Sequence, residues 1–466
     1  MILYVLQAFI FCIIHGTSSS IRFGTPLSDD SHLPSTELHL MDEEIQRARE
    51  FTIPKGRPER RLGEEIEFQL FDEEVVIGTV SRIFDRGANG GITWSGNVMC
   101  TNSADRADTS FDHFTLTCVH NDCVARISIE SKRAVFEMGP SPNRDTSARS
   151  MHTISKVDRK LRTGSGPEHR VSSSIHDMVE MFEKPDQDQI LDMGVLYTPE
   201  SLERLGGSHN AMVAKVHNAN ADANLALERS GVSLRYRVVF ILPVLDPTYT
   251  EGSSTFGDLL SFLRVDGDGI FDEAHVYREK YRADLVGIII RNSGSAGMAY
   301  QPSPGFKPQW AFSAYYVDYV NGGVWSHEIG HNLNCWHDRL EDGVSSNSSF
   351  YGYGDCWEDA SKNDCTCYKS IMVYDCNTTA NSCTSCSERP YLSNKYIIDA
   401  GNPTGSDLAS CGLHIHNTRY TATNYRAANQ EGGIMESVLP AIVAKDVCYV
   451  VNITGWAFSF GPSDFV

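Results

Sequence analysis

The first third of the chain alternates apolar and polar residues in short runs, which is the period of half-buried β-strands. Gly, Asn and Asp separate these runs, as expected where a chain turns. The runs cover residues 65–84, 91–96, 113–118 and 123–138. We therefore predict a small β-rich unit over about residues 63–140.

The pattern changes after residue 162. A polar segment with Gly and Ser covers residues 163–185 and is typical of a linker. Beyond it, helical and strand patterns alternate: helix at 206–231, strand at 233–244, helix then strand at 277–292, and helix at 322–333. Interleaved helices and strands predict an α/β sandwich, expected over residues 186–430. A length of 466 residues is consistent with two folded units.

The chain opens with an apolar stretch from Ile2 to Ile14, followed by small residues up to Ser20. About 13 apolar residues fall short of the ~20 that a transmembrane anchor needs, so we interpret residues 1–20 as a signal peptide. No Lys or Arg precedes the apolar core, as it does in most signal peptides. We expect a secreted, extracellular protein. Residues 431–466 form a tail whose apolar part could be strand, anchor or unstructured.

The formal net charge is −20, and no run of Lys and Arg interrupts the acidic composition. This charge disfavours nucleic acid and anionic membrane surfaces as partners, and we expect no nucleic-acid partner. Of the 13 cysteines, Cys12 lies in the signal segment, three lie before residue 162 and nine after it. In a secreted chain they predict disulfides, although Cys383 and Cys386 also have the spacing of half a zinc ribbon. Sequons at Asn347, Asn377 and Asn452 predict a glycoprotein.

The stretch "GGVWSHEIGHNLNCWHDRLEDG", residues 322–343, holds the candidate chemistry. His327 and His331 are four residues apart, so on a helix they can present two imidazoles to one metal ion. Glu328 lies about 100° around that helix and can reach a metal-bound water without ligating the metal. A catalytic zinc keeps three protein ligands, and His337 is the candidate for the third.

His337 can join the pair only if the helix stops. In a continuous helix it would lie about 280° around the axis from His327, facing away. A turn after Leu333 needs a residue that tolerates positive φ, and Asn334 stands there. The spacing therefore predicts a helix break at Asn334. A plain helix surface that happens to carry histidines is the alternative.

The segment "HEIGHNLNCWHD" resembles the metzincin zinc signature HExxHxxGxxH, with Asn334 in place of the usual Gly. Asp338 after the third histidine resembles the reprolysin (adamalysin) branch. Downstream, "SIMVYD" resembles the family's Met-turn and places Met372 there. The similarity to microbial reprolysin-like peptidases extends over about residues 190–428, and more weakly to their propeptide around "ITWSG".

The resemblance implies a zincin-like fold: a twisted mixed sheet with an active-site helix, preceded by a β-rich propeptide domain. It implies an edge strand at Gly297, Met298 and Ala299 along which a protein or peptide substrate would lie extended. Met372 would at most support the zinc site; without the zinc motif, a plain core methionine would be the preferred interpretation. Tyr374 could contact the transition state, as in related families, or could be packing.

The ligand set predicts a zinc metalloendopeptidase. One Zn²⁺ held by the three histidines would activate a water and polarise the scissile carbonyl. Glu328 would act as general base and pass the proton to the leaving amine. A zinc hydrolase of non-peptide amides and a catalytically silent secreted binding protein remain alternatives.

Two further patterns are weighed as metal sites. The run "RVDGDGIFDEAH", residues 264–275, suggests Ca²⁺, but Phe271 and Tyr277 stand where an EF-hand needs Gly and Glu, so a solvated turn is favoured. His414 and His416 would share a face on a strand. The resemblance implies a helix there, which would turn the two rings apart.

Residues 21–162 are interpreted as a propeptide, so the protein would be a zymogen. Arg159 and Arg162 form an R-x-x-R motif in the polar segment, and a processing convertase is expected to cleave there. The propeptide would inhibit the enzyme, either by covering the cleft or through a free thiol among Cys100, Cys118 and Cys123 that binds the zinc.

Overall fold

The computed structural model describes residues 21–23, 45–52, 62–71, 74–86, 91–100, 112–120, 122–129, 134–140, 151–157, 189–244, 249–251, 255–291, 296–302, 306–343, 348–362, 366–374, 376 and 386–426. The predicted signal segment 1–20, the linker 163–185, the tail 431–466, the motif Arg159/Arg162 and the three sequons lie outside the described residues.

The N-terminal part forms one nine-stranded sheet, in the order β1-β3-β4-β5-β6-β7-β8-β9-β2. Strands β3 to β8 coincide with the predicted runs, while β1, β2 and β9 extend the sheet beyond residues 63–140. The strands are β1 (Ile21–Phe23), β2 (Ile45–Thr52), β3 (Glu65–Phe71), β4 (Glu74–Asp85), β5 (Ile92–Cys100), β6 (His113–Val119), β7 (Asp122–Ile129), β8 (Ala134–Pro140) and β9 (Met151–Val157).

Cys118 and Cys123 face each other across the β6–β7 hairpin and form a disulfide, with their Cα atoms 4.1 Å apart. Both are buried in the core of this sheet. The prediction of a free, zinc-blocking thiol is therefore wrong for these two residues, because the hairpin pairs them with each other. Cys100, at the end of β5, is the remaining N-terminal candidate.

The second domain is built on a five-stranded sheet in the order β11-β10-β12-β14-β13. Four strands are parallel, and the short edge strand β13 runs antiparallel to β14. The predicted edge strand is thus confirmed as an edge strand of this sheet. The five strands are β10 (Gln189–Tyr197), β11 (Leu234–Pro243), β12 (Leu285–Ile290), β13 (Gly297–Ala299) and β14 (Phe312–Tyr316).

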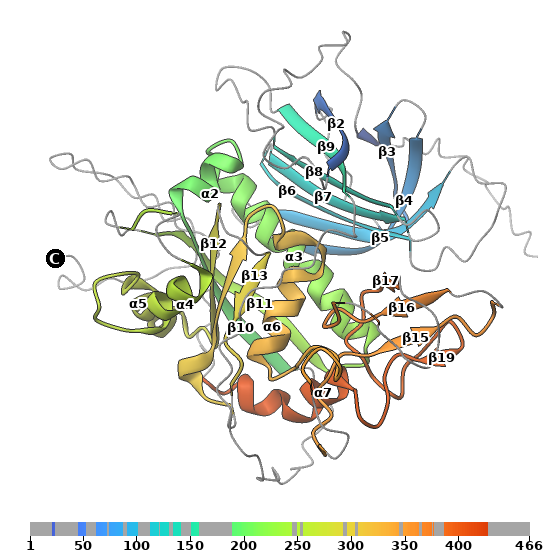
Figure 1. Cartoon of the computed structure of the whole chain (residues 1–466). Coiled ribbons are helices and arrows are strands. Elements are labelled where there is room, and N and C mark those ends of the chain that lie inside the picture. The colour runs from blue at the N-terminus through green and yellow to red at the C-terminus, as the bar shows by residue number, and fades with distance from the viewer. Residues whose placement is uncertain are drawn as a thin grey trace, which may run out of the picture.

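Helices cover both faces of this sheet, which confirms the predicted α/β arrangement (Figure 1). One hydrophobic cluster joins the sheet to α3, α6 and α7, and another joins it to α4 and α5. Parallel strands covered on both faces become almost wholly apolar, as the sequence "LVGIII" of β12 illustrates. The helices are α2 (Pro199–Arg204), α3 (His209–Arg229), α4 (Phe256–Arg264), α5 (Glu273–Tyr281), α6 (Trp325–Asn332) and α7 (Cys411–Ala422).

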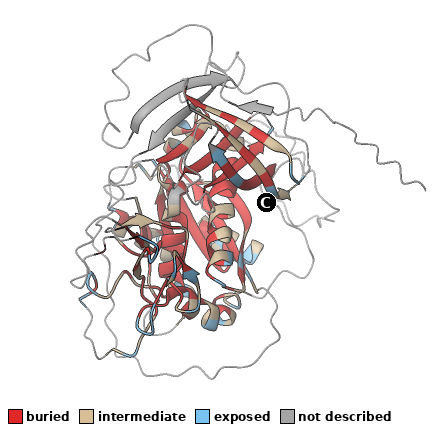
Figure 2. Ribbon diagram, turned by 90° about the vertical axis from the view of Figure 1, so that its right-hand side faces the viewer, coloured by how far each residue is buried: buried red, intermediate tan, exposed pale blue. Residues whose placement is uncertain are grey.

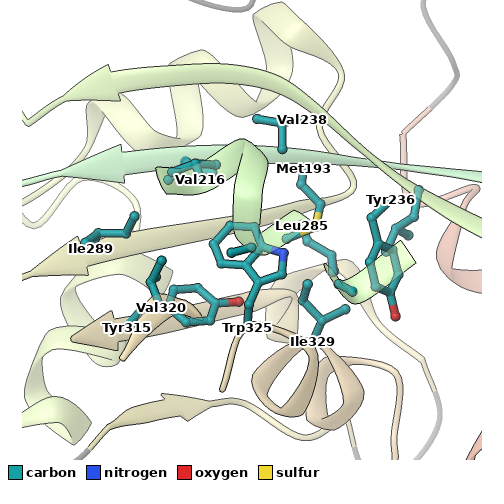
Figure 3. Close-up of a cluster of buried hydrophobic side chains, with 14 of the residues drawn as sticks. Met193, Val216, Tyr236, Val238, Leu285, Ile289, Tyr315, Val320, Trp325 and Ile329 are labelled. Carbon is teal, nitrogen blue, oxygen red and sulfur yellow. The ribbon is translucent and has the colours of Figure 1, made fainter. Parts of the chain in front are cut away.

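Helix α6 is anchored to the sheet by its inner face. Trp325 stacks on Tyr315 of β14, with ring centroids 4.6 Å apart, and Ile329 lies one turn further along in the same cluster (Figure 3). All three side chains are buried, and Figure 2 shows the burial of the surrounding strands. Because this face is apolar and closely packed, the orientation of the opposite face of α6 is fixed.

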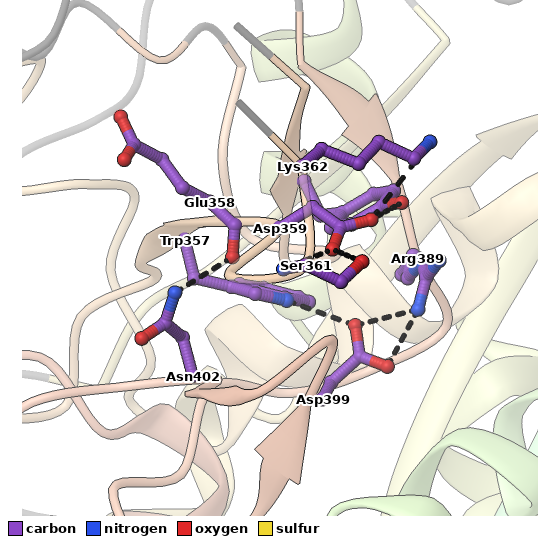
Figure 4. Close-up of polar contacts among 9 residues, drawn as sticks. Trp357, Glu358, Asp359, Ser361, Lys362, Arg389, Asp399 and Asn402 are labelled. Atoms are coloured by element: carbon purple, nitrogen blue, oxygen red, sulfur yellow. Dashed lines mark hydrogen bonds and ion pairs between the residues drawn. The ribbon is translucent and has the colours of Figure 1, made fainter. Parts of the chain in front are cut away.

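The segment after α6 contains short strands: β15 (Cys356–Glu358), β16 (Cys367–Lys369), β17 (Ser387–Glu388), β18 (Ile398–Asp399) and β19 (Asn402–Pro403). Disulfides join Cys356 to Cys376 and Cys367 to Cys386. A buried polar network reinforces them (Figure 4): Arg389 pairs with Asp399 at 2.5 Å, and Trp357 Nε1 donates to Asp399 at 2.8 Å. A region with few apolar residues is thus held by covalent and polar links.

The N-terminal sheet packs on α3 of the second domain (Figure 1). Val119 and Val124 belong to the same hydrophobic cluster as α3. Asn218 Nδ2 donates to the carbonyl oxygens of Thr115 and Val124, at 2.9 and 3.3 Å. Asp222, also on α3, accepts a hydrogen bond from the Thr115 hydroxyl. The contact is therefore both apolar and polar.

No helix in the described part of the chain is long and apolar enough to cross a membrane.

Candidate zinc site

Three buried histidines meet at the outer face of α6. His327 and His331 lie one turn apart on the helix, and His337 comes from the chain that follows it. The Nε2 atom of His331 lies 3.1 Å from that of His327 and 3.1 Å from that of His337. The remaining pair, His327 and His337, is separated by 3.3 Å. Three ring nitrogens therefore point at one small volume.

Helix α6 ends at Asn332, one residue before the predicted end, and Leu333 is its C-cap. Asn334 has φ +62°, and its N–H donates to the carbonyl of His331 at 2.8 Å. The N–H of Cys335 donates to the carbonyl of Gly330 at 2.8 Å. This hydrogen-bond pair is a Schellman motif, which reverses the chain at a left-handed residue. The predicted helix break and positive φ at Asn334 are confirmed.

Two of the histidines are oriented through Nδ1, the ring nitrogen that does not point into the cluster. His327 Nδ1 lies 2.8 Å from the carbonyl oxygen of Ile371, and His331 Nδ1 lies 2.9 Å from that of Cys335. A carbonyl oxygen can accept a hydrogen bond but cannot donate one. Both Nδ1 atoms therefore carry the proton, and both Nε2 atoms present a lone pair. The disulfide between Cys335 and Cys411 of α7 holds the second of these carbonyls in place.

A carboxylate that the sequence analysis did not identify stands behind the third histidine. Asp342 Oδ1 lies 3.6 Å from His337 Nδ1, and both side chains are almost fully buried. At this distance the contact is electrostatic rather than a hydrogen bond; a carboxylate beside the ring nitrogen opposite the metal-facing one favours the ring orientation and basicity that metal binding needs. Its distance of five residues from His337 fits no fixed helical or strand spacing, so only the fold reveals it.

The three histidines fit a tetrahedral zinc ion. Ligands about 2.0–2.1 Å from zinc lie about 3.3–3.4 Å apart in a tetrahedron, close to the nitrogen separations of 3.1–3.3 Å found here. Burial lowers the pKa of His327 to about 3 and the pKa of His331 well below its usual value, and the charge of neighbouring His337 adds to both effects. Neutral imidazole is the form that binds a metal ion.

Met372 lies beneath the active-site helix. A β-carbon at Gly330 would be 2.5 Å from Met372 Sδ, so the helix can rest on this side chain only because residue 330 is a glycine. Met372 is fully buried, and the preceding residue, Ile371, provides the carbonyl for His327. Met372 therefore packs in the core and also supports the turn that orients a histidine.

Glu328 faces the edge strand. A β-carbon at Gly297 of β13 would lie 2.6 Å from Glu328 Oε1, so the carboxylate rests against the strand backbone. Asn332 joins the same helix to this edge of the sheet, because its Nδ2 donates to the carbonyls of Tyr300 and Phe312 at 2.7 and 3.0 Å. The structure thus brings the candidate base and the candidate substrate strand together.

Tyr374 also lies at the site. Its ring centroid is 4.1 Å from that of His337 and 5.5 Å from that of His327, and the residue is only half-buried. The Tyr374 ring therefore packs on the histidines at a partly exposed position, which is compatible both with packing and with a contact to the transition state.

The other candidate residues lie elsewhere. Asp338 Oδ1 accepts from the N–H groups of Leu340 and Glu341, so it caps the turn after the third histidine. In the run at 264–275, Asp272 accepts from Gly267 and Gly269, as in a solvated turn. His414 and His416 both lie on α7, as the resemblance implied, and are not part of the histidine cluster.

Comparison with known proteins agrees with this geometry. The family model described as metallo-peptidase family M12 matches residues 187–385, a range that contains all three histidines and the edge strand. Residues 187–385 are an M12 metallopeptidase domain. Peptidases of this family use zinc, so the predicted resemblance and the predicted enzyme class, a zinc metalloendopeptidase, are confirmed.

Curated relatives of the M12 domain include two bacterial proteins named peptidyl-Asp metalloendopeptidase. The protein of Stenotrophomonas maltophilia strain K279a is 26% identical over 378 residues, which cover 78% of this chain and 83% of the relative. That of strain R551-3 is 30% identical over 239 residues, covering 49% of this chain and 54% of the relative. Among solved structures, metalloproteinase-II from Bacteroides fragilis aligns with a TM-score of 0.32 at 9% identity, covering 65% of this chain and 85% of that one.

Proposed function

We propose that this protein is a secreted zinc metalloendopeptidase, made as a zymogen, in which His327, His331 and His337 hold one zinc ion and Glu328 is the general base. The convergence of the three Nε2 atoms within 3.3 Å, with the Glu328 carboxylate beside the edge strand, is the observation that carries the proposal. Three protein ligands are the number that a catalytic zinc keeps.

Bound zinc would supply a Lewis acid for the scissile carbonyl and would acidify a water for attack. The residues of this chain do the rest. Glu328 accepts the proton of the attacking water and transfers it to the leaving amine. The substrate pairs with β13, whose outer edge is open within the five-stranded sheet, and so presents its carbonyl next to Glu328. The half-buried Tyr374 ring borders the same volume and could contact the transition state.

The relatives' name suggests a substrate class. Because both are called peptidyl-Asp metalloendopeptidase, we propose that this enzyme cleaves proteins next to an acidic residue. Preference for one charged side chain requires a complementary charge near the zinc, since the backbone contacts of strand addition do not distinguish side chains.

We further propose that residues 21–162 are a propeptide that inhibits the enzyme until a convertase removes it. Its sheet binds α3 through Asn218 and Asp222, as described above. His113 and Arg126 of this sheet also line a pocket together with Ser326 and Ile371. Ser326 precedes His327 in the helix, and the carbonyl of Ile371 orients the His327 ring. These contacts beside His327 support the proposal that the bound sheet inhibits the zinc site.

The proposal is tested by protein hydrolysis. Casein or gelatin should be degraded by the secreted, processed chain, and a zinc chelator should abolish the activity until zinc is restored. Activity on small non-peptide amides alone would favour the hydrolase alternative. A processed chain that contains one zinc ion and degrades no protein would favour the binding-protein alternative.

A further inference from the structure

Lys369 is a cation next to the zinc site that the proposed mechanism does not use. It ends β16, in register with Cys356 of β15 and Glu388 of β17. Two residues later the chain makes the Ile371–Met372 turn under the histidines. The Lys369 ammonium bridges this turn, because its Nζ donates to the carbonyl of Tyr374 on the other side. Lys369 is half-buried, so its charge is only partly screened by water.

The ammonium of Lys369 is close enough to influence the zinc ligands. Tyr374, whose carbonyl it binds, packs its ring on His337 and His327. A positive charge beside a bound zinc ion opposes metal binding, so its presence there suggests a role with an anionic group.

Other cations are less suited to that role. Arg389, whose N–H donates to the carbonyl of Lys369 at 2.9 Å, is buried and pairs with Asp399 (Figure 4). Its guanidinium carbon lies 3.6 Å from the centroid of the Tyr368 ring. Arg126 belongs to the N-terminal sheet, which processing would remove. Arg264 lies beyond the end of β13, with its guanidinium 4.9 Å from the Trp310 ring centroid.

We propose that Lys369 determines specificity by binding the side-chain carboxylate of an acidic substrate residue beside the scissile bond. An ammonium has three N–H donors, and the carbonyl of Tyr374 accepts from one of them. Glu388 lies opposite Lys369 in the strand register, so the substrate carboxylate would share the ammonium with Glu388. Lysine is a flexible point charge without the fork geometry of arginine, so Asp and Glu should both be accepted. This inference rests on the proposed peptidase function.

The test compares matched peptides that differ only in one residue beside the cleaved bond: Asp, Glu, Asn or Lys. The full chain is secreted, collected in its active form, and assayed as parent and as Lys369→Met, which keeps the stem and removes the charge. We expect kcat/KM for the Asp peptide to fall on the order of tenfold to a hundredfold, the strength of a hydrogen bond to a charged group. The Asn peptide should change by less than about threefold, because it offers no charge to lose.

Matched variants separate specificity from folding. Lys369→Arg should keep most of the preference for Asp over Asn, and Lys369→Glu should shift the preference toward the Lys peptide. Arg264→Met should leave the Asp/Asn ratio unchanged. Bound zinc is measured in every variant. If the Lys369→Met variant contains no zinc, Lys369→Gln is used in its place.

The results distinguish the two proposals. An equal loss for the Asp and Asn peptides in Lys369→Met, or an altered ratio in Arg264→Met instead, overturns the role of Lys369. A parent enzyme that cleaves both peptides equally overturns it as well, while leaving peptidase function intact. A zinc-loaded, processed parent that cleaves no peptide overturns the peptidase function itself, and Lys369 specificity with it.

Discussion

The carboxylate of Glu328 rests against the backbone of Gly297: a β-carbon at residue 297 would lie 2.6 Å from Glu328 Oε1. The candidate base and the edge strand are therefore in direct contact, although Gly297 and Glu328 are 31 positions apart in the sequence. A side chain at residue 297 would have to displace the Glu328 side chain, so this contact rather than backbone conformation favours glycine, since the residue is not among those with positive φ.

Gly297→Ala should displace the Glu328 carboxylate. Because a misplacement of about 1 Å in a catalytic group can cost about a hundredfold in rate, we expect kcat/KM to fall at least about tenfold. The histidines do not touch residue 297 in the described contacts, so bound zinc should stay at the parent level. Steady-state kinetics with zinc analysis checks this. Parent-like kinetics in Gly297→Ala would show that the contact is unimportant.

Glu328→Ala should remove the proton carrier and leave the three ligands in place. General base catalysis contributes about 10²–10⁴-fold, so protein cleavage should fall by that order while zinc remains bound. Glu341→Ala is the matched control, because Glu341 is an exposed carboxylate that follows the third histidine. If Glu328→Ala retains a rate within tenfold of the parent, the assignment of the base is wrong.

The ligand set could be predicted from the sequence because its information is local. His327 and His331 follow helical spacing, and Asn334 is a residue that accepts the positive φ of a helix end. The same holds for the α/β pattern and for the strands β3 to β8, whose periodicity is visible in single runs.

The remaining features depend on contacts between distant segments. Asp342 and Gly297 acquire their roles only when the chain places them beside His337 and Glu328. Strands β1, β2 and β9 lack a long alternating run of their own, and β2 pairs with β9, which lies about a hundred residues further along the chain. The Cys118–Cys123 pairing requires the register of the β6–β7 hairpin.

Asn334 should tolerate glycine and resist a β-branched residue. Gly meets the φ of +62° without strain, so Asn334→Gly should bind zinc like the parent. Asn334→Val should destabilise the turn by about 1–2 kcal/mol, because a bulky side chain clashes in the left-handed region. Zinc affinity by chelator competition compares the two. Equal affinities would contradict the role of the turn in presenting His337.

Asp342, rather than Asp338, should govern the third ligand. Replacing a carboxylate that orients a metal-binding histidine typically costs about 10–100-fold in metal affinity, and we expect this for Asp342→Asn. Asp338→Asn should cost less than about threefold, because Asp338 Oδ1 caps a turn and the amide oxygen of Asn can accept the same hydrogen bonds. Chelator competition on both variants measures the difference. A larger loss in Asp338→Asn would reverse the assignment.

The proposed zymogen should be cleaved between the two folded parts of the chain. Strand β9 ends at Val157 and β10 begins at Gln189, so the R-x-x-R motif ending at Arg162 falls in the connection between them. N-terminal sequencing of active enzyme should therefore begin at Thr163 or within the following residues. The Arg162→Ala variant should be secreted as a longer chain with much lower activity, because the N-terminal sheet stays covalently attached and remains bound to α3 near the zinc site. Arg61→Ala, in the basic run "RPERR" at residues 57–61 that precedes the β-rich unit, should be processed like the parent. Full activity from an Arg162→Ala chain that retains residues 63–140 would rule out inhibition by this sheet.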